Sequence, residues 1–257
     1  MKTNFKTSLK FATTLIVSML FLCLCSVDTL ASEKEDDGQW TSLFNGKDLS
    51  GWTVKCKAAD KEKPLWKVDQ ETILANSLDY KGHDYVWLMS DKVYSQFVLR
   101  LKFQAYRDSK GNSGIQIMSR YDDDDQGGWL NGPQVDINPR GFWRTGMIWD
   151  ETRGNQRWIF PDLAEGWVNK SMAKPGIIFY YSDEKSGWND FEIKVEGLKV
   201  TATLNGVIVT DFNGDGILND ETHKKLNVGQ KGFIALQIHK GDQLKIRYKD
   251  IKIKELK

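Results

Sequence analysis

Residues 199–212, KVTATLNGVIVTDF, contain two short segments joined by the pair Asn205-Gly206. Apolar and polar residues alternate on both sides of that pair. An Asn-Gly pair between alternating segments is the strongest short-range signal for a β-hairpin, because both residues tolerate the positive φ of a type I′ turn. The stretch therefore predicts two antiparallel strands with one apolar face.

The same two-residue period recurs along the chain. It is clear in FVLRLKFQ at 97–104, in FEIKVEG at 191–197 and in LKIRYKDIKIKEL at 244–256. No long segment has a convincing helical period. Many short strands bounded by Gly, Asn and Asp are typical of an all-β protein. We therefore predict a two-sheet antiparallel sandwich with little helix.

Three of the predicted strands carry unusual polar side chains opposite their apolar face. They are GNSGIQIMSR at 111–120, NGPQVDIN at 131–138 and GFIALQIHKGD at 232–242. In the first, Met118 is expected on the polar face. The polar positions are Gln116, Arg120, Gln134, Asp136, Gln237 and His239. Such short or planar groups make fixed hydrogen bonds. Either the three strands form an ordinary solvated face, or they line one ligand site.

The segment 122–175 interrupts the alternation and is rich in Trp and Arg. We expect a long loop insertion that walls the polar face, since long ordered loops in compact domains are usually functional. Trp129 and Trp149 are the first candidates for stacking on a ligand, and Arg144 and Arg153 for closing the rim. Amides, a carboxylate and aromatic rings together suit a sugar, whose hydroxyls need directional partners and whose C–H faces pack on rings.

The first residues have the layout of a secretory signal peptide. Three lysines precede an apolar run from about Phe11 to Leu24, and Ala31 ends a small-x-small cleavage site. We predict a signal peptide at 1–31, an acidic leader at 32–40 and a single domain at 41–257. The protein would then be secreted or periplasmic. The alternative is a lipoprotein attached through Cys25.

Composition narrows the classes of partner. Cleavage after residue 31 would lower Lys+Arg from 36 to 33 and Asp+Glu from 35 to 34, which gives a net charge of about −1. This charge argues against nucleic acid or an anionic membrane surface as a partner. The N-terminal apolar run is too short for a comfortable membrane span, so none is expected in the mature chain. Only Cys56 would remain, which leaves no intrachain disulfide and no zinc cluster.

The stretch DFNGDGILNDE at 211–221 matches the first half of a calcium loop. Asp211, Asn213 and Asp215 stand at ligand positions, but Thr222 occupies the place of the bidentate Glu. We expect a turn held by Asx hydrogen bonds, with a structural Ca²⁺ as the alternative. The sequence identifies no other cofactor.

An ordered series of motifs runs from about Thr41 to Leu256. The series is SLFNGKDLSGW, WKVDQETI, FVLRLKFQ, GNSGIQIMSR, GPQVDI, WNDFEIKVEG, LNGV, GFIALQIH and KDIKIKEL. It resembles the 3-keto-disaccharide hydrolase family. The resemblance implies a concanavalin A-like jelly-roll sandwich. It also implies extracytoplasmic proteins that cleave glycosides whose C3 hydroxyl has been oxidised to a ketone. The central segment is longer here than in the shorter members of the family.

The implied reaction needs a general base near neutral pKa, an acid for the leaving group, and donors at the C3 oxygen. His239 is the expected base, because imidazole titrates near neutrality. His83 and His223 are expected to be solvated. Asp136 would either orient His239 as its partner or play a plain hydrogen-bonding role, and Glu151 is a second acid/base candidate. The expected substrate-binding residues are Asn112, Gln116, Arg120, Trp129, Gln134, Arg144, Trp149, Arg153 and Gln237.

Two other functions stay open. An ordinary glycoside hydrolase would use two facing carboxylates, and Asp136 with Glu151 could serve. The sequence shows no inward-facing pair of acids on neighbouring strands. A non-catalytic, lectin-like module would bind sugar without needing a base, so His239 beside Asp136 argues against it.

Overall fold

The computed structural model describes residues 39–123, 128–184 and 186–257. The predicted signal peptide at 1–31, its rival lipidation site Cys25 and nearly all of the leader at 32–40 lie outside the described residues.

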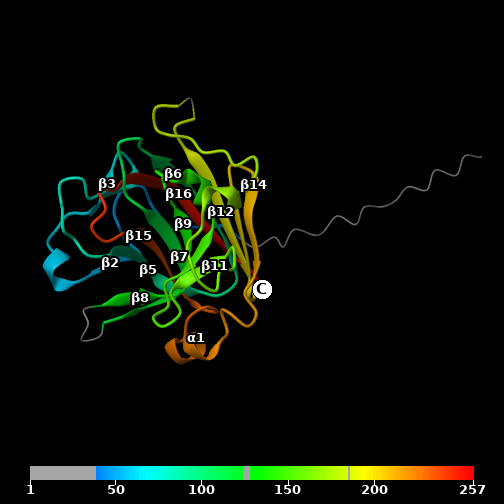
Figure 1. The fold of residues 1–257 in the computed structure, drawn as a ribbon. Helices are drawn as coiled ribbons and strands as arrows, with labels where there is room; N and C mark the ends of the chain where they lie inside the picture. Colours follow the sequence, from blue (N-terminus) through cyan, green and yellow to red (C-terminus); the bar gives the residue numbers. More distant parts are fainter. Residues whose placement is uncertain (1–38, 124–127, 185) are drawn as a thin grey trace, which may run out of the picture. The chain divides into compact units, whose positions relative to one another are not determined.

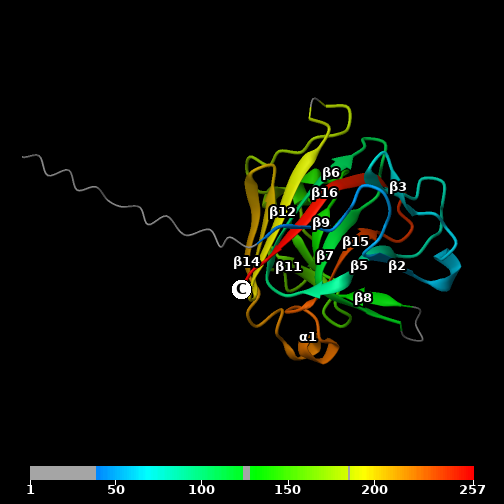
Figure 2. The same ribbon diagram turned by 180° about the vertical axis from the view of Figure 1, so that it is seen from behind.

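Two eight-stranded antiparallel sheets make up the described domain (Figure 1; Figure 2 gives the view from behind). The first sheet contains, in spatial order, β14 (Val207–Asn213), β13 (Lys199–Leu204), β12 (Asn189–Glu196), β6 (Phe97–Ala105), β16 (Lys245–Glu255), β4 (Thr72–Asn76) and β3 (Trp66–Asp69), with β1 (Thr41–Ser42) paired to β16. The second contains β11 (Arg157–Phe160), β10 (Ile148–Asp150), β9 (Pro133–Ile137), β7 (Ser113–Asp122), β15 (Gly232–Ile238), β5 (Val86–Tyr94) and β2 (Trp52–Cys56), with β8 (Trp129–Asn131) paired to β7. The predicted sandwich of concanavalin A-like, jelly-roll type is confirmed.

Helix is scarce among the described residues. It amounts to α1 (Glu221–Leu226) and the short 3₁₀ turns η1 (Ala58–Asp60), η2 (Phe142–Arg144) and η3 (Lys170–Met172). The segment 122–175 is not a loop throughout, because it contributes β8, β9, β10 and β11 to the second sheet. Of these, β9 falls within the stretch 131–138 that the alternation predicted as a strand. The other three are only three or four residues long, which is too short to give a clear period in the sequence.

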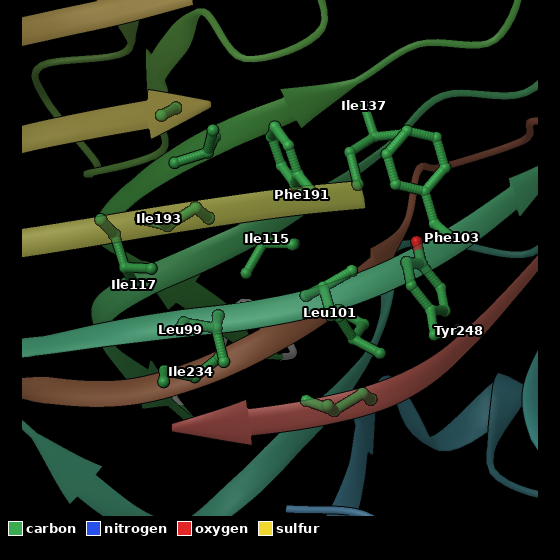
Figure 3. Close-up of a cluster of buried hydrophobic side chains, with 14 of the residues drawn as sticks. Leu99, Leu101, Phe103, Ile115, Ile117, Ile137, Phe191, Ile193, Ile234 and Tyr248 are labelled. Carbon is green, nitrogen blue, oxygen red and sulfur yellow. The ribbon is translucent and has the colours of Figure 1, made fainter. Parts of the chain in front are cut away.

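The core lies between the sheets, where the apolar faces of β6 and β12 meet those of β7, β9 and β15. Figure 3 shows the side chains of this cluster. It includes Leu99, Leu101, Phe103, Ile115, Ile117, Ile137, Phe191, Ile193, Ile234 and Tyr248. Full burial of one such side chain stabilises the fold by about 1.5–3 kcal/mol. Because alternate residues of a strand point to opposite sides, the polar side chains of β7, β9 and β15 lie on the face away from this core.

The hairpin that predicted the architecture has the expected geometry. Leu204 pairs with Val207, and the turn residues Asn205 and Gly206 have φ of 47° and 81°. Positive φ at both positions is the signature of a type I′ turn, whose twist matches that of the flanking strands.

One position of β7 departs from the prediction. Met118 has φ of 51° and is buried in the core beside Ile117, instead of lying on the polar face. The register opposite β15 slips here, because Ser119 pairs with Phe233 while Gln116 pairs with Ala235. Two residues of β7 thus face one of β15, which is a β-bulge, and the alternation restarts after it.

The acidic stretch that resembled a calcium loop is a turn held by its own side chains. Asn213 Oδ1 accepts the Asp215 amide at 3.2 Å, and Asp215 Oδ1 accepts a hydrogen bond from Asn219 at 2.9 Å. Asp211 instead pairs with Lys199 across the hairpin. The described residues hold no cluster of three or more His, Cys, Asp or Glu side chains placed to bind a metal. Helix α1 follows this turn, although no helical period marks these residues in the sequence.

No described helix has both the length and the apolar character needed to cross a membrane.

Candidate active site

The outer face of the second sheet is polar and yet buried. Gln116, Gln134, Asp136 and Gln237 are each at most 2 % exposed. An ordinary solvated face would leave such groups in water, so that reading of the three strands is wrong. The burial also means that the side chains need partners on this face, because an unpaired buried polar group costs about 1–3 kcal/mol.

A pocket of about 160 Å³ opens on this face. It is lined by Tyr85, Asn112, Gln134, Asp136, Arg144, Trp149, Glu151, Gln156, Trp158, Trp167 and His239. Seven of these eleven residues were predicted from the sequence. Ligand pockets commonly measure about 300–1,000 Å³, so this smaller pocket has room for no more than about one sugar ring.

Glu151 lies at the end of β10, where its backbone N–H binds the carbonyl of Gly132 at 3.1 Å. Its carboxyl group is buried and accepts a hydrogen bond from Gln237 Nε2 at 3.2 Å. Burial raises the pKa of Glu151 to about 7, against the opposing hydrogen bonds from Gln237 and Trp149. A carboxyl group with such a pKa can give or take a proton at neutral pH.

Asp136 forms an ion pair with Arg144, whose Nε lies 2.8 Å from Oδ2. Burial raises the pKa of Asp136, and the guanidinium of Arg144 opposes that rise. The predicted role of Asp136 as the group that orients His239 is therefore not the geometry found. The sequence could not reveal the pairing, because Arg144 comes from η2 in the segment expected to be a loop.

His239 follows β15 directly and contacts two residues that the sequence analysis did not single out. Its Nε2 lies 3.1 Å from the hydroxyl of Tyr85, and its Nδ1 lies 3.5 Å from Asp242 Oδ2. Burial raises the pKa of the Tyr85 hydroxyl above its usual range, so Tyr85 stays neutral. The ring of Tyr85 meets His239 edge-on and stacks on Trp87, which fixes the imidazole from behind.

Three tryptophans of the central segment wall one side of the pocket. The ring centroids of Trp149, Trp158 and Trp167 lie 5.2–5.4 Å apart. Arg144 lies over Trp158 and Trp167 at 5.7 and 5.8 Å. Trp158 is buried, whereas Trp167 is 58 % exposed and can offer its face to a ligand. The wall thus combines apolar rings with a cation.

Several buried polar atoms of the lining have no hydrogen-bond partner within the described part of the protein. They are Asn112 Oδ1, Gln134 Oε1, Trp158 Nε1 and His239 Nδ1. Such atoms are rare in native proteins unless water or a ligand binds them. The two amide oxygens accept hydrogen bonds, His239 Nδ1 can accept one, and Trp158 Nε1 donates one. A ligand with several hydroxyl groups can satisfy all four atoms, because a hydroxyl group both donates and accepts.

The other predicted site residues do not line this pocket. Gln116 donates to the carbonyl of Leu130, and Arg120 donates to the carbonyl of Asn227 at the end of α1. Trp129 donates to the backbone carbonyl of Glu151 at 2.7 Å, and Arg153 lies over its ring. Gln116, Trp129 and Arg153 thus surround the strands that carry the pocket, whereas the bulge in β7 turns Arg120 toward α1.

The two carboxyl groups of the pocket come from neighbouring strands. Asp136 belongs to β9 and Glu151 follows β10, and these strands pair with each other. The proximity of Asp136 raises the pKa of Glu151 further. An inward-facing pair of acids on neighbouring strands is therefore present, contrary to the expectation from the sequence. The alternation could not show it, since Asp150 and Glu151 are adjacent and the strand ends between them.

His83 and His223 are buried, against the expectation that both are solvated. The ring nitrogens of His83 lie 2.7 and 2.9 Å from the carbonyl oxygens of Asp84 and Asp242. His83 thereby holds the turn that carries Asp242 beside His239. Both histidines have charged neighbours in the sequence, KGHDY and DETHKK, which suggested exposure to solvent. Charged neighbours along the chain do not show whether a side chain is buried by residues far away in the sequence.

His223 of α1 lies between two carboxylates behind the pocket. Its Nδ1 is 2.8 Å from Asp220 and its Nε2 is 3.3 Å from Asp150, the residue before Glu151. Burial alone would lower the pKa of His223, but Asp150 and Asp220 outweigh burial and raise it. The pair Asp150–His223 therefore fixes the end of β10.

We expect His223→Ala to lower the free energy of unfolding by about 3–5 kcal/mol near pH 6, because it leaves Asp150 buried without a counter-ion. The pKa of His223 is higher in the folded than in the unfolded chain, so its contribution is full below about pH 6.5. It should shrink as the pH rises through the folded pKa. Denaturant unfolding of both proteins at several pH values measures this difference. A difference that grows with pH would contradict the ion pair.

A family match, together with this fold, makes the protein a carbohydrate-active domain of the glycosyl-hydrolase-like class. Residues 39–254 match the 3-keto-alpha-glucoside-1,2-lyase-like domain, and the chain belongs to this family, which its motifs resembled. Comparison with curated proteins found no match.

Solved structures with the same fold support the architecture. Two candidate glycosyl hydrolases from Parabacteroides distasonis share 21 % identity over 85 % of this chain; they are covered to 94 % and 100 %, with TM-scores of 0.52 and 0.51. A Bacillus subtilis protein with a galectin-like fold shares 10 % identity over 79 % of this chain and 89 % of its own, with a TM-score of 0.50. At these identities the likeness shows the fold alone.

Proposed function

We propose that the protein cleaves glycosides of 3-keto sugars by abstraction of the C2 proton and β-elimination, followed by hydration. The observation that carries the proposal is one small pocket that combines His239, a carboxyl group with a pKa of about 7 and a cation. Family membership supports the substrate class.

The chemistry follows from the acidity of the C2–H bond next to a ketone. A base takes the C2 proton, and the electron pair of the C–H bond forms an enolate with the C3 oxygen. The enolate then forms the C1=C2 double bond and expels the glycosidic oxygen, which takes a proton from an acid. Addition of water across that double bond puts hydroxyl on C1 and a proton on C2, so the net reaction is hydrolysis.

The pocket offers a residue for each of these steps. His239 is the base: Tyr85 holds its Nε2, and its Nδ1, which has no hydrogen-bond partner among the described residues, takes the C2 proton. Protonated Glu151 is the acid for the glycosidic oxygen, because its raised pKa keeps it partly protonated near pH 7. Arg144 binds Asp136 through Nε, and its other N–H groups can donate to the C3 oxygen as negative charge develops there.

The fate of hydrogen at C2 tests this mechanism. When a 3-keto-glucoside is cleaved in D₂O, we expect deuterium at C2 of the product, because the C2 proton is lost and replaced from solvent. The 3-keto product incubated without enzyme gives the rate of spontaneous exchange. Products that keep their C2 hydrogen under these conditions would exclude elimination.

A second function is favoured by the carboxyl groups of Asp136 and Glu151 in one pocket. They could act as the acid and base of an ordinary glycosidase, which needs no ketone. We prefer the first proposal, because Asp136 is engaged by Arg144 and an ordinary glycosidase has no use for a histidine base. Retained C2 hydrogen would favour this second function.

Export is part of the proposal, supported by the lysine-plus-apolar leader of the sequence. Cleavage after Ala31 would leave Ser32 as the first residue, and intact-mass measurement of protein from the native cell distinguishes it from a lipidated Cys25.

Trp167 is expected to bind sugar with little effect on the fold. It lines the pocket and is largely exposed, so Trp167→Ala should weaken ligand binding by roughly 2- to 12-fold, the contribution of one aromatic contact. Titration followed by tryptophan fluorescence measures the affinity. Trp188→Ala is a matched control, since Trp188 lines neither this pocket nor the cavity that adjoins it. Equal affinity in the Trp167→Ala protein would show that the wall is structural.

A further inference from the structure

A second, outer pocket of about 480 Å³ adjoins the candidate active site. The two pockets share Asn112, Arg144, Trp167 and His239, so they form one continuous cavity. The rest of the outer pocket is lined by Lys110, Asn138, Arg140, Gly141 and Asp242. A group bonded to a sugar in the inner pocket can extend into this space.

The charges of the outer pocket are unbalanced. Arg144 is engaged by Asp136, and Asp242 adds one negative charge, because His239 is neutral when it acts as the base. Lys110 and Arg140 are exposed, and neither has a carboxylate within 4 Å among the residues that the structure describes. Two unpaired cations against one carboxylate leave the outer pocket with an excess of positive charge.

The excess of positive charge at Lys110 and Arg140 is local, because the protein as a whole is not basic. The chain has 36 Lys and Arg against 35 Asp and Glu. Some exposed cations elsewhere have acidic neighbours, such as Arg107 with Asp183 and Lys199 with Asp211, and others in the described part of the chain stand singly on the surface. Lys110 and Arg140 differ from the single cations because they line one cavity together. A local excess of one sign beside a cleft attracts ligands of the opposite sign.

We propose that the outer pocket is the leaving-group subsite and that it selects a sugar carrying a carboxylate or a sulfate ester, bound by Lys110 and Arg140. The assignment rests on the proposed function, since the leaving group is joined to the reacting ring through the C1 oxygen. Trp167 lies in the wall common to both pockets and contacts both sugar units. Arg140 supplies planar, paired donors that fit either anion, and Lys110 supplies a point charge.

Three substrates with one linkage test the subsite. A 3-keto-glucosyl unit is joined to glucose, to glucuronic acid or to glucose 6-sulfate, so that the leaving hydroxyl is the same in all. We expect kcat/KM to be about 5- to 30-fold higher for the anionic substrates, the contribution of two ionic contacts at a partly exposed rim. Comparison of kcat/KM for the glucuronic acid substrate and the glucose 6-sulfate substrate shows which anion the subsite favours. Added salt should reduce the preference.

A double variant, Lys110→Gln/Arg140→Gln, should lose the preference. The control Lys61→Gln/Lys231→Gln removes the same charge from exposed positions away from the cavity and should keep it. Equal kcat/KM for neutral and anionic substrates, or a preference that survives in the first double variant, would overturn the subsite.

Binding separates this inference from the proposed function. Calorimetric titration of the His239→Ala protein with the three compounds measures affinity without turnover. If wild-type protein cleaves none of them but the anionic ones bind more tightly through Lys110 and Arg140, the subsite stands and the proposed reaction fails. If the neutral compound is cleaved and no anionic preference exists, the reaction stands and the subsite fails.

Discussion

Replacing His239 with alanine is expected to lower kcat on a 3-keto-glucoside by roughly 10²–10⁴-fold, the usual contribution of a positioned general base. The affinity for substrate should change less than kcat, because the base acts mainly in the transition state. The protein should stay folded, since His239 follows β15 at the pocket and Ile238 provides the neighbouring core contact. Steady-state kinetics with circular dichroism as a fold control measure both effects.

Two further variants separate the base from the groups that hold it. Tyr85→Phe removes the hydrogen-bond partner of Nε2, and Asp242→Asn removes the negative charge 3.5 Å from Nδ1; both should cause smaller falls in kcat than His239→Ala. Asp136→Asn should act on Arg144 instead, because these two form the ion pair. A folded His239→Ala enzyme with unimpaired kcat would remove His239 from the mechanism.

Glu151→Gln is expected to have the second large effect, about 10²–10³-fold on kcat, because the amide keeps the shape of the side chain but cannot give a proton. The fall should be greatest for a poor leaving group such as an alkoxide, and small for a nitrophenolate that leaves without protonation. Kinetics of the variant on both kinds of 3-keto-glucoside measure the contrast. Equal falls for both leaving groups would contradict the role of Glu151 as the acid.

The dependence of activity on pH is an independent test of Glu151 as the acid. Burial raises the pKa of Glu151 to about 7, and the acid must be protonated to act. Activity on the poor leaving group should therefore be lost as the pH rises through about 7. That limb should be absent from the profile of Glu151→Gln, and a limb that persists in the variant would belong to another group.

The fold could be predicted from the sequence because the period of two residues is a local property. The pair Asn205-Gly206 predicted the hairpin. The alternation in β7, β9 and β15 predicted the apolar residues that these strands place in the core. The bulge at Met118 could not be predicted, because an extra residue in one strand is visible only against the register of its partner.

The site could be predicted in its residue types but not in its pairing. Asp136, Gln134, Gln237 and His239 followed from the alternation of their strands. Tyr85 lies just before β5, where no period applies, and only a long-range contact brings it to His239. Asp242 lies three residues after His239, in a turn that the alternation of β15 does not reach.

The most direct measurement is the release of the leaving group from a glucoside and from its 3-keto form, incubated side by side with the protein. We expect rapid release from the 3-keto form and slow or no release from the parent glucoside, because only the ketone makes the C2–H bond acidic. Equal release from both would exclude β-elimination as the main reaction and favour a glycosidase that uses Asp136 and Glu151.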